Sequence, residues 1–172
     1  MPGVCGTGSV MPRAFWHPGL SRRVVIGDAA LSVMRRHRQW PFFNEAGGLL
    51  FATIGQDAIH IVEATIPNRK DGRGSNYFEI DLNGAQSTID ERFQHGLHYV
   101  GEWHTHPVGH PSPSARDRTT MTSAFAKSKH GLQALLLIIV GRRLDGGGLW
   151  VSLHNAKGSL RLCEATTVAP PK

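Results

Sequence analysis

The chain has 172 residues, of which 40% are hydrophobic and 19% are charged. This length fits one domain with its own core, and no stretch approaches the ~20 consecutive apolar residues that a membrane-spanning helix needs. The net charge is +6 and the sequence pI is about 9.9. However, the basic residues are scattered and no nucleic-acid-binding motif is present, so nucleic acid is not the expected partner.

The hydrophobic pattern predicts strands and helices that follow one another along the chain. The first helix has Asp28 as its candidate N-cap, and Pro41 prevents it from continuing. Three helices are expected, from Asp28 to about Gln39, from Asn83 to about His95, and from about Ser114 to Ser128. The expected strands are 24–26, 47–55, 58–67, 77–82, 97–105, 132–141, 149–154 and 159–165.

Together these elements predict an α+β domain with a single mixed β-sheet flanked by helices. The polar, Gly-bearing segment 67–76 is expected to be a loop. We expect a flexible N-terminal tail at 1–20, a domain at 21–165 and a C-terminal tail at 166–172. The first residues lack the layout of a signal peptide, so a cytoplasmic location is expected.

The segment "GEWHTHPVGHPSPSARD", residues 101–117, contains the strongest candidate site. Side chains two apart in a strand point the same way, so His104 and His106 share one face near a strand end, while Trp103 points into the core. Asp117, one turn into the next helix, can return over that strand end as a third ligand. Two imidazoles and a carboxylate leave the fourth position of Zn²⁺ open, which is typical of catalytic rather than structural zinc sites.

Two simpler interpretations apply to the parts of this segment. The chain has ten histidines, so a His-x-His pair alone has little weight, and Ser114 with Asp117 also fits a helix-capping box. The joint pattern is His-Thr-His-Pro, six residues, Ser, two residues, Asp, and it arises by chance with a frequency of roughly 10⁻⁵. The joint pattern therefore favours a metal site, and a capping role for Ser114 can coexist with it.

This pattern resembles the signature of the JAMM/MPN (JAB domain) zinc metallo-isopeptidases, which is His-Ser/Thr-His-Pro followed by Ser-x-x-Asp. That family also has an upstream glutamate before a strand, and "NEAGGLLFA" supplies Glu45 at that place. "YVGEWHTHP" and "EAGGLL" resemble short, stand-alone bacterial members, some of which accompany antiphage operons with ubiquitin-like conjugation machinery. The resemblance covers roughly 24–162 and implies the JAB/MPN (cytidine deaminase-like) fold.

The resemblance also implies a role for each motif residue. His104, His106 and Asp117 would hold one Zn²⁺ per chain. Glu45 would be the general base, and Ser114 would donate a hydrogen bond to the oxyanion. Glu102 shares the strand face of His104 and is a rival for the base by parity alone. The resemblance favours Glu45, which makes Glu102 a partner of the ligands or a polar residue at the sheet edge.

The implied activity is cleavage after the C-terminus of a ubiquitin-like protein or a similarly conjugated protein, in a role in antiviral defence. Relatives bind such a tail as an added strand. Arg69 and Arg73, in the loop 67–76, are candidate substrate contacts, and a solvated basic loop is the alternative. Three other functions stay open: a peptidase that processes a sulfur-carrier protein, a non-catalytic MPN scaffold, and a basic nucleic-acid-binding module.

Overall fold

The computed structural model describes residues 11–128 and 131–165 of the chain. Its helices are α1 (Asp28–Arg36), α2 (Leu82–Gln94) and α3 (Ala115–Lys127), with a short 3₁₀ turn at Gly146–Gly148. Its strands are β1 (Arg13–Trp16), β2 (Arg23–Ile26), β3 (Gly47–Ile54), β4 (Ala58–Ala64), β5 (Gly72–Gly74), β6 (Tyr77–Glu79), β7 (His98–Thr105), β8 (Leu135–Val140), β9 (Leu149–Asn155) and β10 (Gly158–Glu164).

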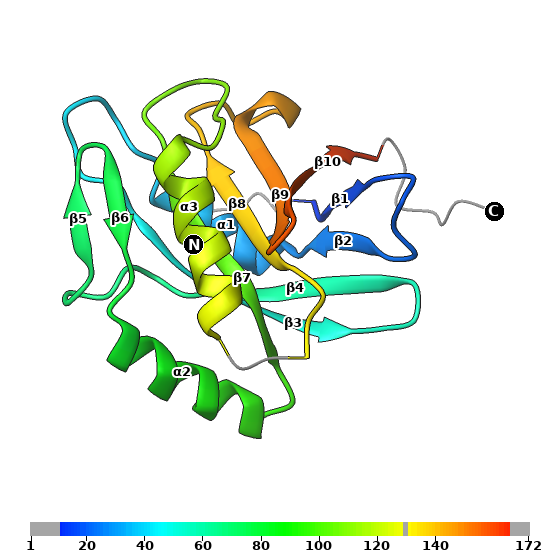
Figure 1. Ribbon diagram of the computed structural model, residues 1–172. Coiled ribbons are helices and arrows are strands. Elements are labelled where there is room, and N and C mark those ends of the chain that lie inside the picture. Colours follow the sequence, from blue (N-terminus) through cyan, green and yellow to red (C-terminus); the bar gives the residue numbers. More distant parts are fainter. Residues whose placement is uncertain (1–10, 129–130, 166–172) are drawn as a thin grey trace, which may run out of the picture.

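Eight of these strands form one strongly curved sheet in the order β1-β10-β9-β8-β7-β3-β4-β2 (Figure 1). The sheet closes because β1 pairs with both β10 and β2. The pairs β2/β4 and β7/β8 are parallel and the other neighbours are antiparallel. The expectation of a single mixed sheet flanked by helices is therefore confirmed.

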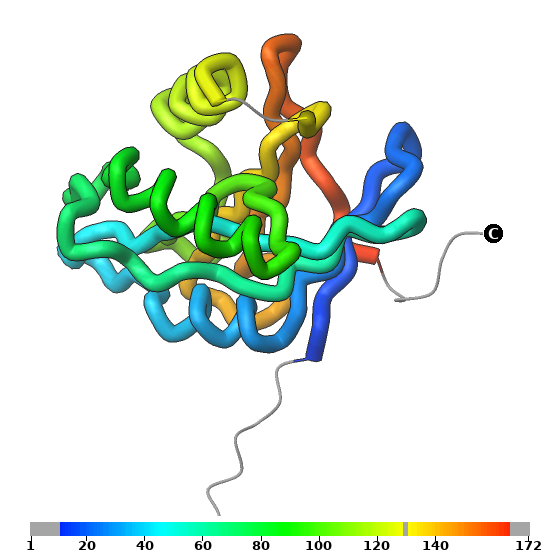
Figure 2. Tube along the Cα trace, turned by 90° about the horizontal axis from the view of Figure 1, so that it is seen from below, coloured from blue at the N-terminus to red at the C-terminus, as the bar shows by residue number. Residues whose placement is uncertain are grey.

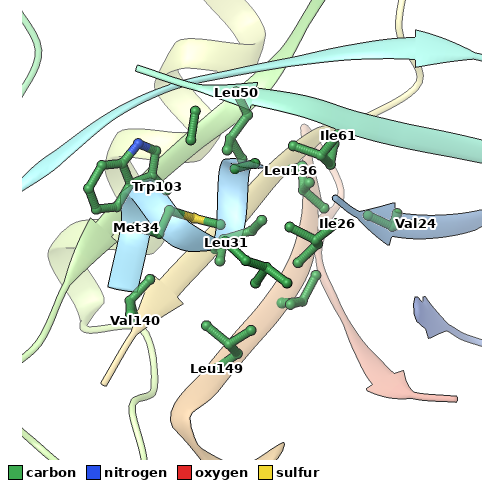
Figure 3. Close-up of a cluster of buried hydrophobic side chains, with 14 of the residues drawn as sticks. Val24, Ile26, Leu31, Met34, Leu50, Ile61, Trp103, Leu136, Val140 and Leu149 are labelled. Carbon is green, nitrogen blue, oxygen red and sulfur yellow. The ribbon is translucent and has the colours of Figure 1, made fainter. Parts of the chain in front are cut away.

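The apolar run of β8 shows why the sheet needs helices on both faces. Leu136, Ile138 and Val140 belong to a core that is lined by all eight strands of the sheet and by α1. Figure 3 shows part of this core, including Leu136 and Val140. The alternate residues of β8 pack in a second cluster with Met121 of α3. A strand buried on both faces reads as a continuous hydrophobic run, and Figure 2 shows α1 and α3 on opposite sides of the sheet.

The helix ends differ in part from the sequence predictions. Ser114 is the N-cap of α3, as expected. By contrast, Asp28 is the first residue of α1 rather than its cap, and α1 ends at Arg36. The cap of α2 is Asp81, not Asn83, because the Asp81 carboxylate reaches the N–H of Gly84 at 3.0 Å. No helix in residues 11–128 and 131–165 is long and apolar enough to span a membrane.

Two segments have more structure than the sequence predicts. Residues 13–16, placed by the sequence analysis in the tail 1–20, form β1 of the closed sheet, while 1–10 and 166–172 lie outside the described residues. The expected loop 67–76 contains β5, which pairs with β6 in a two-stranded hairpin. This hairpin and α2 lie outside the curved sheet (Figure 1). Strands of three residues are too short to produce a detectable alternation.

A glycine brings two strands of the sheet close together beneath β6. Gly47 begins β3 and pairs with His104 of β7. A Cβ atom at Gly47 would lie 2.5 Å from both the Phe78 ring and the Trp103 carbonyl oxygen. Because no side chain fits there, the start of β3 and the end of β7 lie directly against each other under the hairpin.

Candidate metal centre

The end of β7 and the start of β3 are joined just beside the expected ligands. The Thr105 N–H donates to the Ala46 carbonyl at 2.8 Å, and the Ala46 N–H donates to Thr105 Oγ1 at 2.9 Å. His104 and His106 flank Thr105, and Glu45 precedes Ala46. These two bonds therefore bring the upstream glutamate of the sequence motif next to the His-Thr-His segment.

Four predicted site residues have their polar atoms close together. Nε2 of His104 lies 3.2 Å from Nε2 of His106. The Asp117 carboxylate lies 3.5 Å from Nε2 of His104 and 3.4 Å from Nε2 of His106. Oε1 of Glu45 lies 4.0 Å from Nε2 of His106. Glu45 and His104 are buried and His106 is partly buried, so the cluster is largely shielded from solvent.

The spacing of the two imidazoles and Asp117 suits a tetrahedral metal ion. Zinc bonds of about 2.0–2.2 Å give a tetrahedron with edges of roughly 3.3–3.6 Å. The separation of 3.2 Å between the two imidazole nitrogens is close to such an edge, and the Asp117 carboxylate faces both rings, with Oδ1 3.5 Å from His104 and Oδ2 3.4 Å from His106. The donor set of two nitrogens and one carboxylate is also a common one for catalytic zinc. The residues present therefore fit such an ion.

The first turn of α3 holds Asp117 through a capping box. The Ser114 N–H donates to Oδ2 of Asp117 at 2.7 Å, and the Asp117 N–H donates to Oγ of Ser114 at 3.1 Å. The capping interpretation and the ligand interpretation thus apply to the same residues. Because Oγ of Ser114 acts as the acceptor in the cap, its own O–H stays available to donate to another group.

The carboxylates of the cluster have pKa values shifted in opposite directions. Burial alone would raise the pKa of Asp117, but hydrogen bonds with His104 and His106 outweigh it and hold the pKa well below its usual range. Burial raises the pKa of Glu45 to about 7, against a smaller opposing effect of His106. Two carboxylates with different proton affinities can take different roles, one as a ligand and one as a proton carrier.

Glu102 lies beside this cluster, under a small pocket. The pocket is walled by β6 and α3 and also reaches His104 and Asp117. Oε1 of Glu102 accepts a hydrogen bond from the Tyr99 hydroxyl at 3.3 Å, and burial raises the Glu102 pKa to about 7. Glu102 is thus inside the sheet, since β7 pairs with β3 on one side and β8 on the other, rather than at its edge.

The two candidate substrate contacts differ in their surroundings. Arg69 is exposed in the segment before β5. Arg73, within β5, donates from Nε to the backbone carbonyl of Glu45 at 2.7 Å. The Glu45 N–H in turn donates to the Gly74 carbonyl at 2.8 Å. The sequence does not predict this connection, because it joins a hairpin and a loop that are about thirty residues apart and share no motif.

The hairpin also contacts α3, the helix that carries Asp117. Arg116, between Ser114 and Asp117, forms an ion pair with Glu79 of β6, and its guanidinium lies 4.9 Å from the centre of the Tyr77 ring. No role for Arg116 was predicted from the sequence. The sequence did contain one signal for such a role. Arg116 lies between Ser114 and Asp117, so it must be close to the expected metal.

The chain is similar to known prokaryotic proteins over most of its length. The family model described as prokaryotic homologues of the JAB domain matches residues 28–153. A protein of Enterobacter hormaechei named CD-NTase/cGAS isopeptidase is 33% identical over 135 residues, covering 77% of this chain and 75% of the relative. A Vibrio cholerae protein of the same name is 35% identical over 118 residues, covering 66% and 70%.

A solved structure agrees with these relatives at the level of the fold. The solution structure of a protein from Desulfitobacterium hafniense superposes with a TM-score of 0.53 at 22% identity. The match covers 76% of this chain and 81% of that protein. At this identity the likeness supports the architecture described above and no more.

Proposed function

This chain belongs to the family of prokaryotic homologues of the JAB domain, and on that premise we propose that it is a zinc-dependent isopeptidase. One observation carries the proposal: His104, His106, Asp117 and Glu45 come from three separate segments of the chain, yet each has a polar atom within 3.2–4.0 Å of another of the four. A non-catalytic scaffold has no need to keep all four. The same observation speaks against a nucleic-acid-binding module, for which only the net charge argues.

In the proposed mechanism, His104, His106 and Asp117 would hold the ion. When bound, zinc supplies a Lewis acid that polarises a carbonyl and lowers the pKa of water. Glu45 would accept a proton from the attacking water, and its pKa of about 7 suits a group that must both take and release a proton at neutral pH. It would then pass this proton to the leaving amine.

Ser114 would stabilise the negative charge that develops on the carbonyl oxygen. Its hydroxyl oxygen is oriented by the Asp117 N–H in the capping box, which leaves the O–H to donate. A donor that is already oriented stabilises an oxyanion without reorganising during the reaction. The scheme uses no covalent enzyme intermediate, so a cysteine is not required.

The names of the relatives favour a particular substrate. Proteins called CD-NTase/cGAS isopeptidase suggest that a CD-NTase, joined through its C-terminus to an amine, is the conjugate cleaved here. A ubiquitin-like protein or a sulfur carrier would need the same chemistry at the scissile amide. Arg69 stays a proposed contact for the substrate. A role in antiviral defence and a cytoplasmic location stay predictions.

The test uses a purified CD-NTase whose C-terminus is fused through an amide to a reporter protein. The zinc-loaded enzyme is expected to release the intact CD-NTase C-terminus, as read by mass spectrometry. Glu45→Gln should lower kcat by at least about 10³-fold because the proton carrier is lost, while one zinc per chain is retained.

His104→Ala should lose both zinc and activity. Full activity of Glu45→Gln would contradict the assigned base, and zinc binding that persists in His104→Ala would contradict the assigned ligands. Cleavage of a ubiquitin-like fusion with a higher kcat/KM than the CD-NTase fusion would overturn the substrate but retain the chemistry.

A further inference from the structure

The proposed base is held by its backbone rather than by its side chain. Among the described residues, the Glu45 carboxylate accepts no hydrogen bond, and its near neighbour is His106 at 4.0 Å. Its position therefore depends on where the peptide groups around Glu45 lie. Both polar groups of that residue's backbone are bonded, and both bonds go to β5 rather than to the curved sheet.

The bonds to β5 form one connected set. The Glu45 N–H donates to Gly74 at 2.8 Å, and Nε of Arg73 donates to the Glu45 carbonyl at 2.7 Å. One residue later the pattern changes, because Ala46 exchanges its bonds with Thr105 of β7. The hydrogen-bond partner of the chain thus changes from β5 to β7 directly after Glu45.

A buried glutamine reinforces the same connection from the other side. Gln39 is 2% exposed, and its Nε2 donates to the carbonyl of Phe43 at 2.6 Å and to that of Ser75 at 3.0 Å. Phe43 lies in the loop that leads to Glu45, and Ser75 lies in the turn of the hairpin. Gln39 therefore joins the loop before the base to the segment that follows Arg73 and Gly74.

The opposite strand of the hairpin is anchored to the ligand helix. Arg116 pairs with Glu79 of β6 and lies over Tyr77. The hairpin consequently bridges the loop that carries the base and the helix that carries Asp117. The hairpin lies outside the curved sheet (Figure 1), so these bonds are not part of the pairing that holds the sheet together.

We propose that the β5–β6 hairpin positions the catalytic base, with Arg73 and Gln39 as positioning residues that act through the backbone of Glu45. The proposal rests on the proposed function for the identity of Glu45 as base. It replaces a direct substrate contact of Arg73 with an indirect role. Small displacements of a reacting group cost large factors in rate, so the loss should appear in kcat.

The kinetic test uses the zinc-loaded full chain and the CD-NTase fusion. Arg73→Ala should lower kcat by about 10–100-fold with KM changed by less than about threefold. Arg73→Lys should recover part of kcat, because an ammonium group can donate to the same carbonyl. Gln39→Met, similar in volume but without a donor, should lower kcat in the same way. Arg22→Ala, which removes an exposed arginine-to-carbonyl bond with Gln56 in the β3–β4 turn, is the matched control and should leave kcat unchanged.

A second measurement does not depend on catalysis. Amide hydrogen exchange reports local opening of individual hydrogen bonds. In Arg73→Ala and Gln39→Met, the Glu45 amide should exchange at least about tenfold faster. The Ala46 amide, bonded to Thr105, should be unchanged, and the zinc content should stay at one per chain.

Each contrary result has a distinct meaning. A raised KM with an unchanged kcat would make Arg73 a substrate contact and overturn the positioning role. An unchanged Glu45 exchange rate would do the same. If the wild-type chain cleaves no fusion, the proposed function fails, but the exchange measurement still decides whether the hairpin holds Glu45.

Discussion

Glu102 is a carboxylate in the interior of the sheet whose charge depends on pH. Burial raises its pKa to about 7 in the folded chain, above the value of the unfolded chain. Its folded form therefore prefers the neutral acid, so its contribution to stability is present below the unfolded pKa and is lost as pH rises through about 7. This behaviour predicts what an uncharged side chain of the same shape will do.

In the metal-free protein, Glu102→Gln should be more stable than the wild type at pH 8 by about 2–3 kcal/mol, and nearly equal to it at pH 4. The amide oxygen of glutamine can still accept the bond from Tyr99. Urea unfolding at both pH values measures the difference. Glu91→Gln, at an exposed ion pair with Arg92, is the control and should show little difference at either pH. If Glu102→Gln changes the free energy of unfolding equally at both pH values, the Glu102 pKa is not raised in the folded chain.

At the scale of the elements, β7 and β8 approach so closely at one point that only glycine fits. Gly101 has φ +151, and a Cβ there would lie 1.9 Å from the Leu136 carbonyl oxygen. Gly101→Ala should therefore reduce the free energy of unfolding by about 3 kcal/mol or more, since a backbone atom cannot move aside as a side chain can.

Gly96 provides a matched control for this prediction. It also has a positive φ, +77, but nothing lies within 4 Å of its Cβ position. Gly96→Ala should cost only the backbone strain, about 1–2 kcal/mol. Equal losses in the two variants, measured by urea unfolding, would show that the close approach of β7 and β8 has no part in the effect.

Some elements of the fold could be predicted from the sequence and others could not. Long strands with clear patterns, such as β3, β7 and β8, were predicted, because burial on one or both faces leaves a periodic signal. The resemblance named Glu45, His104, His106 and Asp117, and the structure brings their polar atoms together, while zinc binding by these residues stays a prediction. The strand of β6 was expected within 77–82, but β5 and its pairing with β6 were not predicted, because β5 is short and the stabilising partners of the hairpin, Glu45 and Arg116, are distant in the sequence. Long-range contacts of this kind leave no periodic pattern.

At the scale of the whole molecule, the candidate metal centre lies at the edge of a core that does not depend on it. The main hydrophobic cluster is lined by α1 and all eight strands of the curved sheet. Asp117 is held by the capping box and Glu45 by β5. The fold therefore preorganises the proposed ligands, and metal binding should add stability without being needed for folding.

Removal of the metal should therefore lower the thermal stability of the chain but leave it folded. Zinc at about 100 times its Kd adds about 2.7 kcal/mol to the folded state. For a chain of this size, 1 kcal/mol shifts Tm by roughly 2–4 °C, so a chelator should lower Tm by roughly 5–11 °C. The far-UV circular dichroism spectrum should not change, and Tm of His104→Ala should not respond to zinc. Loss of the spectrum on chelation would mean that the ion holds the fold together, and an unchanged wild-type Tm would mean that His104, His106 and Asp117 do not bind zinc.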